Sequence, residues 1–204
     1  MFPPELAGVL AGFENKGYTI FRDPSNKGYN LNIVGVRSRE DAAGAFDDWV
    51  LCFYELDGSW QYQAMKATTD PGSFYLKNPI NPKGTAILKP GQYRGLWQIG
   101  KHRGQYDALV QVRPCTVFRD NNRDNILDTC GDTPQETGMF GINLHRSLKT
   151  GFGREVGRHS AGCQVICLDL DFNALMHLCH RAARIWGNSF TYTLLEEKDI
   201  AWQP

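Results

Sequence analysis

The chain has 204 residues, with 22 basic and 22 acidic side chains and therefore a formal net charge of zero. A balanced charge gives no general attraction to nucleic acid or to an anionic membrane, so neither is expected as the main partner. Hydrophobic residues make up 42% of the chain, which favours a folded globular protein over a disordered one. This length allows one substantial core or two small ones, and a monomeric state is expected.

The start of the chain shows no targeting segment. Residues 1–5 lack the basic start and apolar run of a signal peptide. The apolar stretches elsewhere are too short to cross a bilayer. These features predict a protein made in the cytoplasm that reaches any external site of action by release or delivery.

Hydrophobic periodicity predicts two helices. Residues 3–16 carry apolar side chains at helical spacing, and Gly17 follows them as a common helix stop. A second helix is expected over 172–186, with Asp171 as its N-cap and Gly187 as the residue that ends it.

Between these helices the pattern is that of β-strands, because aromatic and β-branched residues gather in short stretches separated by turn residues. Asp57-Gly58 is typical of a two-residue hairpin turn. Segment 70–95 is rich in Pro and Gly and is expected to form loops around one short strand. Strands are expected over residues 31–36, 49–54, 60–65, 85–88, 96–100, 108–112, 116–118, 141–144, 164–168 and 189–195. The predicted fold class is mainly β (α+β) with two or so packed helices, in a single domain over 1–204.

Six cysteines are spaced in a way that fits no disulfide framework of a small secreted domain. No Cys-x-x-Cys pair is present, which argues against a zinc knuckle. Most of the six are expected to be small buried residues. They are Cys52, Cys115, Cys130, Cys163, Cys167 and Cys179.

The stretch from 138 to 168 holds the candidate catalytic residues. His145 ends one predicted strand and Cys163 begins another, so neighbouring strands can bring an imidazole to a thiol. A thiol attacks a carbonyl as the thiolate, and a nearby imidazole can take its proton. Gly162 permits a tight turn, and amides around Gly162 and Cys163 can bind the oxyanion of a tetrahedral intermediate. On spacing alone, a lone Cys and a lone His are more often structural.

His145 and the Ser-x-Gly-Cys run that starts at Ser160 are separated by fourteen residues, and this pattern resembles the L,D-transpeptidase catalytic-domain family. The resemblance covers roughly residues 84–170 and extends to phage and prophage proteins of that superfamily. It implies a β-sandwich or barrel, with Cys163 as the nucleophile and His145 as the base. Ser160 and Gly162 would complete the catalytic site, no cofactor would be required, and the substrate would be the stem peptides of bacterial peptidoglycan. Residues 1–80 resemble no family and are expected to be an extension of the same unit.

The chain departs from the family pattern at two positions. Ala161 stands where the family usually has His, and Val165 stands where it usually has an Arg that helps to hold substrate. Arg146 and Ser147 directly follow the base, and either could contact a substrate carboxylate, since Arg suits carboxylates geometrically. Arg146 and Gln164, which stands beside Val165, are the candidate substrate-binding residues. The catalytic pair is implied by the resemblance, while substrate placement is expected to differ.

Other histidines have weaker claims to a function. His102 follows a predicted strand, and a solvated turn is favoured over substrate binding there. His177 and His180 are three residues apart on the second helix, where a polar face is favoured over a metal site. The group that orients the catalytic imidazole is left open between a backbone carbonyl and Ser160.

A second pattern places oxygen-bearing side chains at positions 1, 3, 5 and 9 of a calcium-loop motif. Position 6 is Asn125 rather than Gly, and position 12 is Gly131 rather than the bidentate Glu. Asp and Asn are also usual in turns without metal, so a structural calcium site and a metal-free turn both stay open. The four residues are Asp120, Asn122, Asp124 and Asp128.

Functions from two classes are compatible with these patterns. The first is a cysteine-dependent peptidoglycan peptidase, an endolysin-like wall hydrolase that cleaves stem-peptide amide bonds near a D-amino acid through a Cys163 thioester. An L,D-transpeptidase that exchanges the same bonds, or a toxin that attacks the same wall, would share this chemistry. The second class is a non-catalytic wall-binding or phage structural module that keeps an enzyme-like fold.

Overall fold

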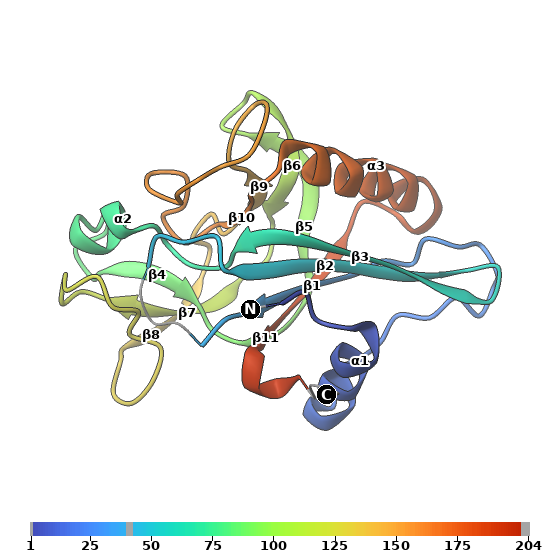
Figure 1. The fold of residues 1–204 in the computed structure, drawn as a ribbon, viewed down its shortest axis with the longest axis horizontal. Coiled ribbons are helices and arrows are strands. Elements are labelled where there is room, and N and C mark those ends of the chain that lie inside the picture. The colour runs from blue at the N-terminus through green and yellow to red at the C-terminus, as the bar shows by residue number, and fades with distance from the viewer. Residues whose placement is uncertain (1, 40–42, 201–204) are drawn as a thin grey trace.

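The computed structural model describes residues 2–39 and 43–200, which form a closed barrel with a small second sheet beside it (Figure 1). The barrel order is β1-β11-β5-β6-β9-β10-β3-β2, and the second sheet runs β4-β7-β8. The barrel strands are β1 (Asn32–Arg37), β2 (Asp48–Leu56), β3 (Ser59–Thr68), β5 (Gly91–His102), β6 (Tyr106–Gln111), β9 (Leu144–Arg146), β10 (Gln164–Ile166) and β11 (Phe190–Glu196). The second sheet contains β4 (Thr85–Leu88), β7 (Cys115–Asp120) and β8 (Gln135–Gly138).

The N-terminal part of the chain belongs to the barrel. Strands β1, β2 and β3 form one side of it; β1 pairs with β11 in parallel and β3 pairs with β10 in antiparallel fashion. The segment 1–80, which resembles no family, thus supplies the strands that close the barrel around β10. Of the predicted domain 1–204, residues 1, 40–42 and 201–204 lie outside the described residues.

Strands β1 and β2 are covered on both faces, because their side chains alternate between two layers. On one face, Ile33 and Val50 lie in the main barrel core. On the other face, Val34 and Leu51 pack against Phe13 of helix α1 (Leu6–Lys16). The long β2–β3 hairpin extends beyond the barrel in Figure 1.

Helix α3 (Asp169–Trp186) covers the barrel core. Five side chains of α3 are buried, among them Phe172 and Leu175. Inside the core, Trp97 and Tyr192 are fully buried with ring centroids 4.4 Å apart. The shorter helices are α2 (Ser73–Lys77) and the 3-10 turn η1 (Glu197–Asp199).

The predicted fold class is confirmed at the level of a mainly β protein with packed helices, since strands hold 37% and helices 19% of the residues. The hairpin at Asp57-Gly58 is confirmed as well. Both residues have positive φ, 51° and 73°, as a two-residue type I′ turn requires. Four of the cysteines are buried and all six are unpaired.

Three local expectations differ from the structure. Segment 70–95 contains helix α2 and the start of β5, as well as loops. The strand expected over 141–144 lies at β9 instead, and β8 precedes it. Asp171 lies inside α3, whose N-cap is Leu168 without a side-chain cap. The apolar periodicity that began at Phe172 therefore marked the buried face of α3 and missed its first turn.

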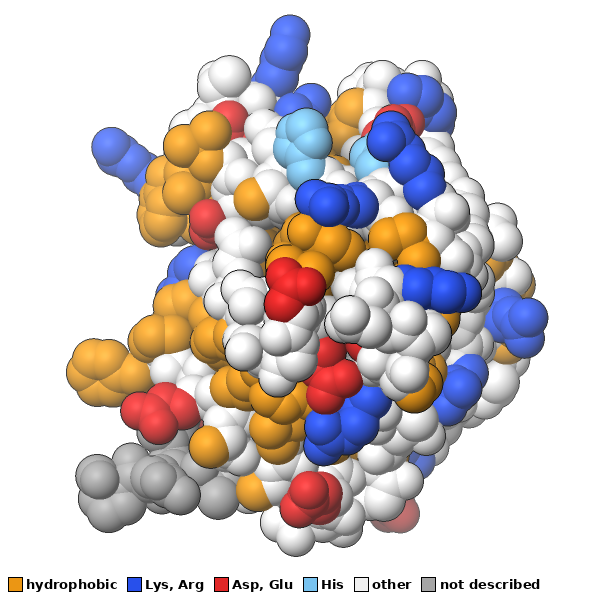
Figure 2. Space-filling model, turned by 90° about the vertical axis from the view of Figure 1, so that its right-hand side faces the viewer, with side chains coloured by type: hydrophobic (Ala, Val, Ile, Leu, Met, Phe, Trp, Pro, Cys, Tyr) orange, Lys and Arg blue, Asp and Glu red, His pale blue; other side chains and the backbone are white. Residues whose placement is uncertain are grey.

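None of the described helices is both long and apolar enough to cross a membrane. Figure 2 views the molecule from the end of the β2–β3 hairpin. On this face, basic and acidic side chains are interspersed with small hydrophobic patches rather than gathered by sign.

Candidate active site

The parallel pairing of β9 and β10 brings His145 and Cys163 to one face of the barrel wall. Val165 lies opposite His145, and Gln164 lies opposite Leu144. Since Leu144 points into the barrel core, alternation turns His145 outward. Cys163 packs with Val165 in a separate cluster outside the barrel, so the thiol and the imidazole lie on the same outer face.

His145 is held as a neutral imidazole with a defined tautomer. Its side chain is buried, and Nδ1 lies 2.9 Å from the carbonyl oxygen of Arg146. A carbonyl only accepts, so Nδ1 carries the proton and Nε2 keeps a lone pair. Burial, followed by the charge of His102, lowers the pKa of His145 to about 3. The sequence left open whether a backbone carbonyl or Ser160 orients the His145 ring. In the structure it is the backbone carbonyl of Arg146.

Cys163 is half-buried and rests as a thiol. Its Sγ donates to the Gly141 carbonyl at 3.2 Å. Burial raises the pKa of Cys163, against the opposing effects of a hydrogen bond from the Asn143 backbone and the charge of Arg103. Within the described structure no hydrogen bond joins this thiol to the His145 ring. The sulfur must therefore turn away from the Gly141 carbonyl before it can react, and such catalytic contacts often tighten only when substrate binds.

Ser160 and Gly162 shape the turn in front of Cys163. Ser160 is fully buried; its Oγ donates to the Cys163 carbonyl at 2.8 Å and accepts from the Gly162 amide at 3.1 Å. Ser160 thus braces the turn and does not orient His145. Gly162 has a φ of +125°, and a Cβ there would lie 2.4 Å from the Ala86 carbonyl oxygen, so the turn requires glycine. Because the Gly162 amide is already bonded, the Cys163 amide remains as the candidate oxyanion donor.

The substrate-binding role predicted for Gln164 is wrong in this structure. The side chain is fully buried and points into the barrel, as the register with Leu144 requires. Its Oε1 accepts from the Tyr192 hydroxyl at 2.7 Å, and its Nε2 donates to the Thr69 carbonyl at 3.3 Å. Gln164 therefore ties the start of β10 to β11 and to the end of β3, away from any substrate.

His102 is the functional candidate that the sequence undervalued. It ends β5, is buried rather than solvated, and stacks on His145 with ring centroids 4.1 Å apart and an interplanar angle of 27°. Burial lowers the pKa of His102, and the charge of Arg103 lowers it further. The sequence analysis ended this strand at Gly100 and therefore placed His102 in a turn. In the structure β5 continues to His102.

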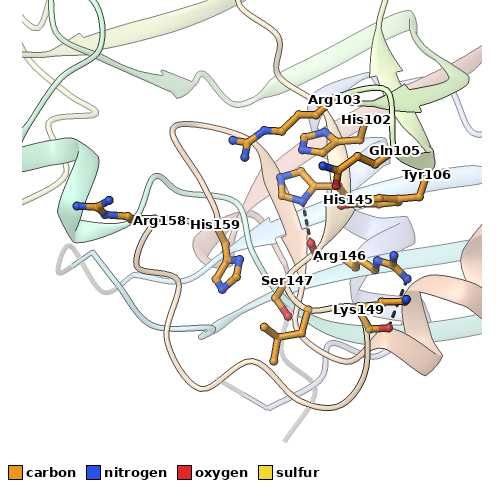
Figure 3. A pocket seen from close by; sticks show the side chains of 11 residues that line it. His102, Arg103, Gln105, Tyr106, His145, Arg146, Ser147, Lys149, Arg158 and His159 are labelled. Atoms are coloured by element: carbon orange, nitrogen blue, oxygen red, sulfur yellow. Dashed lines mark hydrogen bonds between the residues drawn. The ribbon is translucent and has the colours of Figure 1, made fainter.

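A cavity of about 270 Å³ opens beside the two stacked histidines (Figure 3). Arg146 lies over the Tyr106 ring at 4.2 Å, and Arg158 lies over the Phe74 ring of α2 at 3.8 Å. No acidic side chain is among the described residues that line this cavity, so its field attracts anions. Its basic and imidazole side chains are His102, Arg103, His145, Arg146, Lys149, Arg158 and His159.

A second cavity, of about 280 Å³, is lined by the same segment of chain two residues further on. His159 lines the first cavity and Ala161 lines the second. The second cavity also has Tyr75 and Phe140 in its wall. Cys163 follows Ala161 by two residues and is among the lining residues of neither cavity.

The histidines of α3 do not line the first cavity but a neighbouring pocket that shares Tyr106 and Arg146 with it. His180 contacts Asp107 at 3.3 Å, and both His177 and His180 line a shallow surface pocket beside Arg146. In the part of the chain that the structure describes, no group of three or more His, Cys, Asp or Glu side chains is arranged to hold a metal ion.

Replacement of His102 by phenylalanine is expected to move the acidic limb of the pH–activity profile to higher pH. Phenylalanine keeps the stacking but removes the charge that lowers the pKa of His145. The pKa of His145 then rises, and the ring becomes protonated, and inactive as a base, at a higher pH. Arg103 and His159 still face His145 in this variant, so the shift is partial. An activity loss that is equal at every pH would instead assign His102 a purely structural role.

Comparisons of the chain with protein-family models, with curated proteins and with solved structures found no match.

Proposed function

We propose that this protein is a cysteine-dependent peptidoglycan peptidase with an L,D-transpeptidase-like barrel, and that it reaches the wall by release or delivery. The observation that supports this best is the placement of a neutral His145, with Nε2 free, on the strand beside the Cys163 turn. A base and a thiol on one outer face, with the base in the wall of a basic cavity, are the elements of acyl transfer through a thioester.

The proposed reaction begins with transfer of the thiol proton from Cys163 to Nε2 of His145. The thiolate attacks the amide carbonyl, and the Cys163 amide donates to the resulting oxyanion. Collapse of the tetrahedral intermediate breaks the C–N bond, and His145 returns the proton to the leaving amine. A water molecule then attacks the thioester, which releases a free carboxyl and restores the thiol.

The charge of the first cavity suits this substrate. Stem peptides carry carboxylates, and a guanidinium can hold a carboxylate through two parallel hydrogen bonds. Arg146 directly follows His145 in β9, and Arg103 and Arg158 line the same cavity. We propose that these side chains hold a substrate carboxylate next to the reacting bond, in place of the family arginine that is replaced here by Val165. Val165 is fully buried and cannot take that role.

Incubation with tetrapeptide-stem muropeptides and excess D-amino acid is expected to give shortened stems with a free carboxyl as the main product. Transfer requires that water be excluded from the thioester while an acceptor amine is held there. Cys163 is partly exposed, so water can reach a thioester formed there. The family arginine is also absent, and hydrolysis is therefore favoured. Mass analysis of the products distinguishes the outcomes. Stems that carry the added D-amino acid as the major product would assign the protein to the transpeptidases.

One observation favours the non-catalytic alternative. The thiol proton is bonded to the Gly141 carbonyl, and burial raises the pKa of Cys163, as in an inert cysteine. Incubation with purified peptidoglycan tests this alternative, because a wall-binding module would sediment with the peptidoglycan and release no fragments.

A further inference from the structure

Two side-chain oxygens of the loop 120–128, which starts at the last residue of β7, are buried without a hydrogen-bond partner: Asp120 Oδ1 and Asn125 Oδ1. One other buried oxygen among the described residues lacks a hydrogen bond, Asp70 Oδ1, but it lies 2.7 Å from Nε of Arg37 in an ion pair. The two oxygens that have neither kind of partner thus fall within six positions of a single loop. Buried oxygens of this kind are rare in folded proteins and call for a missing partner, such as an ion.

The same loop concentrates negative charge that the protein does not neutralise. Asp120 is only 1% exposed, and its Oδ2 accepts from the Asp128 amide at 3.1 Å, so its carboxylate faces the loop. The amide nitrogen of Asn122 lies 3.0 Å from Asp124 Oδ2 and 2.9 Å from Asp128 Oδ2. Two further carboxylates therefore converge on one point. Within the described residues, none of these three aspartates forms an ion pair with Lys, Arg or His.

We propose that residues 120–128 form a calcium site in which Asp120, Asp124 and Asp128 supply carboxylate oxygens and Asn122 and Asn125 supply amide oxygens. Calcium accepts six to eight oxygen ligands in flexible geometry, whereas magnesium requires a near-ideal octahedron. In the structure the Asn122 amide nitrogen occupies the space between two of the carboxylates, so no ready group of three acids is present. Binding requires this amide to turn its oxygen toward the ion.

The affinity is expected at the weak end of the calcium-loop range. Position 12 of the motif is Gly131, so the bidentate Glu of strong sites is absent. Sites of extracellular modules bind with dissociation constants of about 10⁻⁴–10⁻³ M, and we expect a value in that range.

The position of the loop indicates what calcium would stabilise. Leu127, inside the loop, is buried with Leu76 of α2 and with Ile87 and Phe118 of the small sheet. The amide of Gly72, which precedes α2, donates to the Ser160 carbonyl at 2.9 Å. Calcium is therefore expected to stabilise the sheet and helix that support the nucleophile turn, whatever reaction the turn serves.

The test is thermal unfolding and calorimetric titration of the whole chain, first with a chelator and then with millimolar calcium or magnesium chloride. At ten times the dissociation constant we expect calcium to raise the Tm by about 3–6 °C, and magnesium to raise it less. Asp120→Asn is expected to abolish the rise. In chelator, this variant is expected to melt at or above the wild-type temperature, because it removes one of three repelling charges. A purely structural aspartate would give a variant that melts lower.

Two further variants complete the test. Asp124→Asn removes an exposed ligand and is expected to weaken calcium binding by about tenfold or more, which keeps the proposal testable if Asp120→Asn does not fold. Asp132→Asn, an exposed acid just beyond the loop, is the matched control and is expected to bind calcium as the wild type does. The proposal is overturned if calcium neither binds nor raises the wild-type Tm, or if Asp124→Asn binds with unchanged affinity.

Discussion

Replacement of Cys163 by alanine is expected to abolish wall-degrading activity while the fold is retained. Cys163 is half-buried at the edge of a small outer cluster, so loss of its sulfur costs little packing. Loss of the nucleophile removes the covalent route entirely, and such changes lower kcat by about 10³-fold or more. The measurements are the rate of fragment release from purified peptidoglycan and the Tm of the variant.

A thiol-labelling experiment makes this result specific to the site. Cys130 is exposed, whereas the other four cysteines are buried, so iodoacetamide is expected to label Cys130 as well as Cys163. Cys130→Ser provides the matched background, because this residue lies in the β7–β8 connection and contacts neither catalytic side chain. Intact mass in this background should show one label, and inactivation should follow its incorporation. Wild-type activity in the Cys163→Ala variant would remove the basis of the proposed function.

The sequence predicted those parts of the fold that depend on local pattern. Strand β4 lies where it was expected, and the Asp57-Gly58 turn joins β2 to β3, because turn chemistry and side-chain alternation act over a few residues. The closure of the barrel was not predictable in this way. It depends on pairing between distant segments, such as β1 with β11. The register of such a pair cannot be deduced from the sequence of either segment alone.

The candidate site shows the same limit. The proximity of His145 and Cys163 followed from strand ends, but the carbonyl that orients His145 is a backbone group, which no residue type reveals. Gln164 was assigned to substrate binding because it stands beside Val165, where the family has its arginine, and the sequence alone does not show which face of β10 it takes. The buried Gln164 amide forms hydrogen bonds with the Tyr192 hydroxyl and the Thr69 carbonyl. Its burial therefore leaves neither its oxygen nor its nitrogen without a hydrogen-bond partner.

Replacement of His145 by glutamine is expected to lower activity by about 10²–10⁴-fold, the usual contribution of a general base. Glutamine can still donate to the Arg146 carbonyl, and it fills the buried space against His102, but it cannot take a proton. The Cys163 thiol, which rests protonated in the structure and whose pKa is raised by burial, would then have no base to take its proton as it attacks. Its alkylation by iodoacetamide, measured in the Cys130→Ser background, is expected to slow together with hydrolysis.

The matched control for His145 is His159→Gln, because His159 lines the same cavity and its charge reaches His145. His159 lies on the loop before Ser160, is only partly buried, and has no strand neighbour that would place it against the thiol. It is therefore expected to affect substrate binding more than the chemical step, so that KM rises while kcat changes little. If His159→Gln, rather than His145→Gln, abolished both hydrolysis and Cys163 alkylation, the base would be His159. The orientation of His145 by the Arg146 carbonyl would then serve the structure of β9 alone.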